Sequence, residues 1–112
     1  MINSKRVQWL DKTLDEILEF PAPIRRQAGF QLAKVESGES PDDWKSLSGI
    51  GSGIIEIRLR GTEGIFRVVF VAKFPEAIYV LHCFQKKTQA LSKHDVQIIS
   101  RRYRAVASMS RG

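Results

Sequence analysis

The sequence predicts an α+β fold, in which helices pack against an antiparallel sheet. Three observations support this prediction. Two segments in the first third of the chain carry apolar residues at helical spacing. Three segments rich in Ile, Val, Phe and Tyr follow, separated by short turns, and a final helical segment comes after them. A length of 112 residues with 43% hydrophobic residues indicates one globular domain over residues 1–112.

The N-terminal third predicts a short strand and a helical hairpin. Residues 5–9 fit the strand, and a helix follows in which Asp11 is placed to cap or favour the first turn. Pro21 is expected to stop that helix. A second helix is expected over residues 23–36, and the short connection makes the pair a hairpin.

The polar segment that follows contains Gly49-Ile-Gly-Ser-Gly53. This spacing is not the G-x-G-x-x-G of a dinucleotide-binding turn, and a strand follows it instead of a helix. We therefore expect an ordinary connection into the sheet, held to the core by Trp44 and Leu47.

Three strands are predicted at residues 54–60, 64–73 and 77–85. Their tight connections indicate an antiparallel meander.

The last helix is expected to begin at Ser92, which forms a capping box with Asp95. Its apolar stripe would face the sheet, while Arg101, Arg102 and Arg104 would turn away from it. The fold expected overall is a short strand, a helical hairpin, a three-stranded meander and a C-terminal helix, with the helices on one face of the sheet.

Charged residues collect on the other face. Alternation along the first strand of the meander places Glu56, Arg58 and Arg60 together. Closing both turns evenly pairs Arg58 with Arg67, and Arg67 with His82. This register predicts a row of Arg58, Arg67 and His82 across three strands, unless a β-bulge shifts it.

Such a face is suited to phosphodiester chemistry. Lys86 has the strand parity of His82 and extends the basic surface. Cations stabilise negative charge that develops on a phosphate, and a His, Lys or Glu can move protons. In RNA the 2′-OH can attack the phosphate, so neither a metal nor another cofactor is expected. The alternative is structural, in which Glu56 and other acidic residues simply neutralise the arginines.

The charge distribution points to an acidic partner. The net charge is +6, with seven Lys/Arg against eight Asp/Glu in residues 1–50 and eleven against four in residues 51–112. This excess is typical of proteins that bind nucleic acid or an acidic protein, and by charge alone it is equally typical of a solvated basic surface. No apolar run is long enough to span a bilayer, no secretory signal is recognisable, and Cys83 is the single cysteine. We expect a cytoplasmic protein with no membrane partner.

Five short motifs carry a resemblance to a known family. They are Leu47-Ser-Gly49, Ile55-Glu-Ile-Arg58, Phe66-Arg-Val-Val-Phe70, Ile78-Tyr-Val-Leu-His82 and Phe84-Gln-Lys-Lys87. Together they resemble the RelE/HigB superfamily of toxins from type II toxin–antitoxin systems, and within it the phage-derived HigB-like branch. The resemblance implies a RelE-like fold and a ribosome-dependent, metal-independent mRNA endonuclease. It also implies mRNA and the ribosome as partners, and a helix-turn-helix antitoxin.

The resemblance assigns roles to the charged residues. It implies Arg67 and Lys87 as phosphate-stabilising groups, whereas Glu56 and His82 are the candidates for proton transfer that the residues themselves offer. The residues expected to position RNA are Arg58, Arg60 and Lys86. RelE itself has a lysine in the place of Glu56, and a tyrosine soon after the basic pair where this chain has Thr88-Gln-Ala90.

Two other interpretations stay open. ParE-like relatives of the same fold act on DNA gyrase, so the fold alone does not fix the target. A basic module that binds without catalysis would carry the same charges. The sequence leaves the oligomeric state open.

Overall fold

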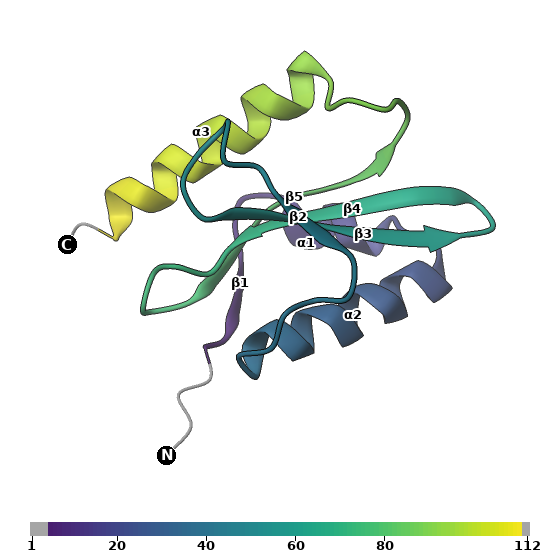
Figure 1. Cartoon of the computed structure of the whole chain (residues 1–112), viewed down its shortest axis with the longest axis horizontal. Coiled ribbons are helices and arrows are strands. Elements are labelled where there is room, and N and C mark those ends of the chain that lie inside the picture. Colours follow the sequence, from purple (N-terminus) through teal and green to yellow (C-terminus); the bar gives the residue numbers. More distant parts are fainter. Residues whose placement is uncertain (1–4, 111–112) are drawn as a thin grey trace.

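Five strands form one sheet in the computed structural model of the protein, which describes residues 5–110 (Figure 1). The elements along the chain are β1 (Val7–Trp9), α1 (Thr13–Leu18), α2 (Ala22–Glu36), β2 (Trp44–Ser46), β3 (Ile54–Gly61), β4 (Gly64–Val71), β5 (Ile78–Lys86) and α3 (Lys93–Met109). The strand order is β1-β5-β4-β3-β2, with β1 parallel to β5 and all other pairs antiparallel. The predicted α+β fold is confirmed.

Strand β2 was not predicted. It has only three exposed residues, Trp-Lys-Ser, which give no alternating pattern to recognise. Its partner is β3, and Lys45 pairs with Glu56. The anchoring prediction for this segment is half right, because Leu47 is buried whereas Trp44 is 45% exposed.

The helices cover both faces of the sheet, so the prediction that they share one face is wrong. Helices α1 and α2 pack on one face around Ile57 and Val68. Helix α3 lies on the other side, where Ile99 packs against Val69 and Leu81 (Figure 1). At the end of the meander that adjoins β1, apolar side chains lie on both faces of the sheet. The second face therefore also needs a helix to bury it.

The helix ends follow the expected rules with one exception. The Ser92 hydroxyl caps α3 by accepting a hydrogen bond from the Asp95 amide, as predicted. Helix α2 ends at Glu36, also as predicted. Asp11, however, does not cap α1. Its backbone is left-handed, with φ 55°, and its carboxylate accepts a hydrogen bond from Arg102.

The register of β3 with β4 is confirmed, because Arg58 pairs with Arg67 as the two-residue turn requires. The register of β4 with β5 is shifted. Phe84, and not His82, pairs with Arg67. The predicted row of Arg58, Arg67 and His82 is therefore wrong.

The cause of the shift is a β-bulge in β5. Val80 pairs with Phe70 and His82 pairs with Val69, which leaves Leu81 as an extra residue between them. Val80 packs with the α1–α2 layer, whereas Leu81 packs with α3. The bulge therefore shifts the alternation of β5 by one residue, so that Cys83 lies in the α1–α2 layer and Phe84 on the α3 face.

No helix within residues 5–110 is both long enough and apolar enough to cross a membrane.

Candidate anion-binding site

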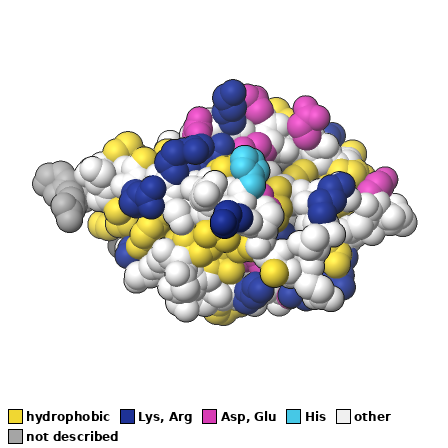
Figure 2. Space-filling model, turned by 90° about the horizontal axis from the view of Figure 1, so that it is seen from above, with side chains coloured by type: hydrophobic (Ala, Val, Ile, Leu, Met, Phe, Trp, Pro, Cys, Tyr) yellow, Lys and Arg dark blue, Asp and Glu magenta, His cyan; other side chains and the backbone are white. Residues whose placement is uncertain are grey.

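A hollow of about 140 Å³ lies on the α3 face of the sheet, beside the N-terminal end of that helix. We call it the basic pocket. Its charged lining comes from the four strands β2 to β5, from the segment after β5 and from the first turn of α3, and consists of Lys45, Glu56, Arg67, Lys86, Lys87 and Asp95. Phe84 also lines it. Figure 2 looks onto the side of the molecule that carries α3 and shows Lys and Arg side chains at several separate places there.

A buried ion pair forms the floor of the basic pocket. Arg67 Nη1 donates a hydrogen bond to Glu56 Oε1, and the two side chains are only 2% and 1% exposed. The two residues stand on adjacent strands, diagonally across the β3–β4 ladder. A buried charge of this kind is strongly unfavourable unless it is paired, so each residue needs the other.

The pairing nevertheless leaves hydrogen-bonding groups unused. Within the described residues, Nε and Nη2 of Arg67 and Oε2 of Glu56 have no hydrogen-bond partner, although all three atoms are buried. Buried polar groups are nearly always satisfied, by protein, by water or by a ligand. Two guanidinium N–H groups beside one carboxylate oxygen suit a ligand that brings both an anion and a hydroxyl.

Lysines surround this floor. Lys45 Nζ lies 3.9 Å from Glu56 Oε1 and its side chain is 53% exposed. Lys87 Nζ donates a hydrogen bond of 3.2 Å to Gln85 Oε1. The pKa of Lys86 is lowered, first by the loss of solvent around its ammonium and then by the positive charges of Arg67 and Arg58. Such mutual repulsion would be relieved by a bound anion.

Lys45 was not among the predicted site residues. It precedes the meander in the sequence and reaches the pocket only because β2 joins the sheet beside Glu56. The sequence signal that could have indicated Lys45 is its place in a polar segment just before a predicted strand, and this signal is weak.

Arg58 and Arg60 lie next to the pocket but do not line it. The Nε atoms of both are 3.9 Å from Asp43 Oδ2, and the Arg58 amide donates to the Asp43 carbonyl at 2.8 Å. Ion pairs that are this long and partly exposed are weak, so both guanidinium groups can turn to another anion.

His82 does not line the pocket, but it lies directly behind two residues that do, Phe84 and Asp95. Its side chain is 7% exposed, and its ring stacks on Phe84 with centroids 4.6 Å apart. Nε2 is 2.8 Å from Asp95 Oδ1 at the start of α3, and Nδ1 is 3.5 Å from Glu16 Oε1 on α1. The imidazole thus connects three elements of the fold.

Arg102 completes this second charged cluster, and the prediction that it turns away from the sheet is wrong. It is 6% exposed, and its guanidinium donates to Glu16 Oε2 at 3.0 Å, Asp11 Oδ2 at 3.1 Å and the Leu81 carbonyl at 2.9 Å. Helical spacing could have indicated this burial, since Arg102 stands three residues after Ile99 and four before Val106.

The cluster also fixes the charge of Glu16. Burial alone would raise the pKa of this carboxyl, but His82, Arg102 and the Cys83 amide outweigh that effect and lower the pKa to about 2. Glu16 is therefore ionised at neutral pH and holds α3 against α1 through Arg102.

Comparison with known families gives one match. Residues 15–104 match the family described as "Phage derived protein Gp49-like (DUF891)". The matched region begins within α1, ends within α3 and includes every residue of the basic pocket. A search among curated proteins gives no match.

Proposed function

The chain belongs to the phage-derived Gp49-like family, a RelE/toxin-like family, and on that basis we propose that it is the toxin of a type II toxin–antitoxin system that cleaves mRNA on the ribosome. The observation that carries the proposal is the unused hydrogen-bonding capacity of the Glu56–Arg67 pair. The HigB-like resemblance of the sequence motifs points the same way.

The reaction that fits this pocket is attack by the 2′-OH of RNA on its own phosphate. A bond forms between the 2′ oxygen and phosphorus while the bond from phosphorus to the 5′ oxygen breaks, which yields a 2′,3′-cyclic phosphate and a 5′-OH end. The unpartnered Oε2 of Glu56 accepts the 2′-OH proton. Arg67 Nε and Nη2 donate to the non-bridging oxygens, where negative charge grows.

The lysines complete the reaction. Lys87 contributes a second positive charge to the phosphate. Lys86, with its lowered pKa, delivers a proton to the departing 5′ oxygen more readily than an ordinary lysine would. Arg58 and Arg60 take the flanking phosphates, because they border the pocket and hold Asp43 only at 3.9 Å.

His82 is the second candidate for proton transfer. Glu56 is the better one, since it lines the pocket and His82 does not. With carboxylates beside both ring nitrogens, His82 is placed to hold the helices together. A His82→Gln variant that folds normally but loses all cleavage would transfer the base role from Glu56 to His82.

The test is cleavage of ribosome-bound mRNA, mapped by primer extension. Arg67→Lys keeps a positive charge beside Glu56 but removes the two unpartnered N–H groups, so cleavage should fall roughly 100-fold. Lys87→Ala, at an exposed site, should have a similar effect without unfolding the protein. Arg104→Ala, on the exposed side of α3, is the charge-matched control and should cleave normally.

The gyrase-targeting and binding-module interpretations predict different results. Intact mRNA together with blocked DNA supercoiling would favour a gyrase-targeting toxin. RNA binding that depends on Arg67, without any cleavage product, would favour the binding module. Full cleavage by both Arg67→Lys and Lys87→Ala would show that the site is elsewhere.

A further inference from the structure

A further hollow lies at the edge of the sheet, where helix α2 ends. Its volume is about 310 Å³, and we call it the Trp44 hollow. Its apolar walls come from α2, from the connection to β2 and from three strands, and consist of Val35, Pro41, Trp44, Ile55 and Phe70. Pockets for small ligands begin at about 300 Å³. The Trp44 hollow therefore suits a single ring system and not a helix or a strand of a partner.

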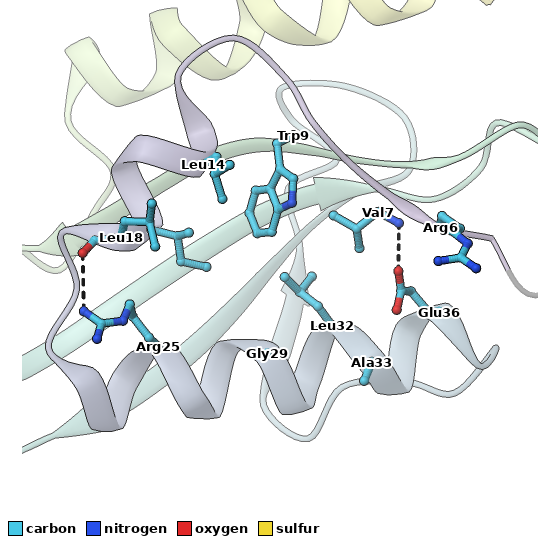
Figure 3. A pocket seen from close by; sticks show the side chains of 11 residues that line it. Arg6, Val7, Trp9, Leu14, Leu18, Arg25, Gly29, Leu32, Ala33 and Glu36 are labelled. Carbon is cyan, nitrogen blue, oxygen red and sulfur yellow. Dashed lines mark hydrogen bonds between the residues drawn. The ribbon is translucent and has the colours of Figure 1, made fainter.

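The Trp44 hollow is separate from the larger hollow between β1, α1 and α2. That larger hollow, of about 430 Å³, contains Trp9, which lies opposite Leu32 of α2 (Figure 3). The two hollows have no lining residue in common. The two tryptophans of the chain therefore have different surroundings, and a ligand in the Trp44 hollow does not touch Trp9.

Trp44 offers a flat aromatic surface to its hollow. It lines the hollow and is nevertheless 45% exposed, whereas tryptophan is usually well buried. Its backbone pairs with Ile57 in the sheet, so the fold fixes its position. Bases of single-stranded RNA bind proteins largely by stacking on aromatic rings of this kind.

Strand β2 joins the Trp44 hollow to the basic pocket. Trp44 pairs with Ile57 on the α2 side of the sheet, while the next residue, Lys45, lines the basic pocket on the α3 side. β2 is the last strand of the sheet and has only three residues (Figure 1). A strand of RNA that leaves the basic pocket past Lys45 therefore reaches Trp44 by crossing one short edge strand.

Two arginines border this crossing. The Nε atoms of Arg58 and Arg60 are each 3.9 Å from Oδ2 of Asp43, the residue before Trp44. Ion pairs of this length are weak, so both guanidinium groups can bind phosphates instead. The path from the basic pocket to the Trp44 hollow is thus positively charged, as the backbone of a nucleic acid requires.

The interior of the Trp44 hollow favours an uncharged ligand. Lys5 lines it, but its ammonium donates hydrogen bonds to the carbonyls of Ala72 and Phe74. Glu39 lines the same hollow and would repel an anion. A nucleobase fits these conditions, because its faces are apolar, its edge is polar and it carries no charge at neutral pH.

We propose that the Trp44 hollow binds an unpaired nucleobase of the RNA strand whose phosphate occupies the basic pocket. The base stacks on the indole of Trp44 and contacts Ile55 and Phe70. The inference rests on the proposed function, because one RNA strand is the ligand of both sites. Trp44 contributes to binding and not to the chemical step, so its loss raises the KM of cleavage and leaves kcat unchanged.

The experiment compares two probes of equal charge on the full chain. One is a short single-stranded 2′-O-methyl RNA, which has no 2′-OH that could attack its phosphate, and the other has the same backbone without bases. Affinity is measured by calorimetry. Trp44→Leu should weaken binding of the RNA roughly 10-fold and binding of the base-free strand by about twofold or less, because stacking requires both a base and a ring.

Two variants serve as controls. Trp44→Phe keeps an aromatic ring and should retain most of the affinity for the RNA. Phe30→Leu changes an aromatic residue that is 63% exposed and outside the lining of the hollow, so it should bind as the wild type does. Because Trp44 is exposed and leucine keeps an apolar side chain there, Trp44→Leu should fold normally.

Fluorescence reports on Trp44 directly. In a Trp9→Phe background Trp44 is the only tryptophan, since the chain has two. The RNA should quench its emission, whereas the base-free strand should leave it unchanged.

Three results would overturn the inference. The first is equal affinity of the wild type and Trp44→Leu for the RNA. The second is an equal loss of affinity for both probes, which would mean that Trp44 supports the backbone or the fold and not a base. The third is a lower molecular mass in solution for Trp44→Leu than for the wild type, which would make a second copy the occupant.

The mRNA cleavage assay separates this test from that of the proposed function. If RNA binding depends on Trp44 but no form of the chain cleaves mRNA, the hollow is assigned correctly and the nuclease function is wrong. If the wild type cleaves mRNA and Trp44→Leu cleaves it with an unchanged KM, the nuclease function stands and the base-binding role of the hollow is wrong.

Discussion

Two acid–arginine pairs lie against the same sheet, and they differ in how fully they are satisfied. Arg102 uses its guanidinium on Glu16, Asp11 and a backbone carbonyl, so the pair is complete. Arg67 has one partner, Glu56, and retains two buried N–H groups without any within the described residues. The first arrangement is what stability requires. The second leaves hydrogen-bonding capacity that no described residue uses.

The largest effect is expected from breaking the complete pair. Arg102→Ala leaves the Glu16 carboxylate without its main partner and should lower the free energy of unfolding by about 3 kcal/mol. Urea denaturation measures this change, and Arg104→Ala should stay within about 0.5 kcal/mol of the wild type. If Arg102→Ala were as stable as Arg104→Ala, the complete pair would not be what holds α3 in place.

Acid should weaken the same pair. The folded-state pKa of Glu16, about 2, is below its ordinary value, so its contribution is full above about pH 4.5 and is lost as the pH falls toward 2. Because the carboxylate is partly exposed, screening reduces the loss to about 2 kcal/mol. Unfolding measured between pH 5 and 2 should show this slope in the wild type, and Glu16→Gln should flatten it. An equal slope in both proteins would contradict the assignment.

The incomplete pair should respond to an added anion. Inorganic phosphate at roughly ten times its dissociation constant should stabilise the folded protein by about 1.4 kcal/mol. Thermal unfolding with increasing phosphate measures this effect. Arg67→Lys should lose it, whereas Arg104→Ala should keep it. Stabilisation that persists in Arg67→Lys would place the anion elsewhere on the basic surface.

The smallest effect is expected at the rim of the basic pocket. Lys45→Ala should weaken phosphate binding only about threefold, because the ammonium is half-exposed and contacts with exposed charges are worth less than about 1 kcal/mol. The same titration measures it. A loss as large as that of Arg67→Lys would make Lys45 a primary ligand of the anion.

The Glu56–Arg67 pair is more predictable from the sequence than the Glu16–Arg102 pair. The two-residue turn determines the β3–β4 register, so it placed Glu56, Arg58 and Arg67 on one face correctly. It could not place His82, because nothing in the order of the apolar residues before it reveals a bulge. It also missed Lys45, whose position depends on a strand of three residues. Arg102 has the helical spacing of the buried residues Ile99 and Val106, but the sequence does not show that Glu16 would be its partner.

The long-range pairings of this fold also set the order in which it can form. Strand β1 can join the sheet only after Ile78, the partner of Val7, has been synthesised. Helix α3 can dock on α1 only after Arg102, the partner of Glu16, has been synthesised. During synthesis the ribosome delivers residues in order, so both of these contacts close late. The chain therefore cannot acquire its native shape until its own translation has nearly finished.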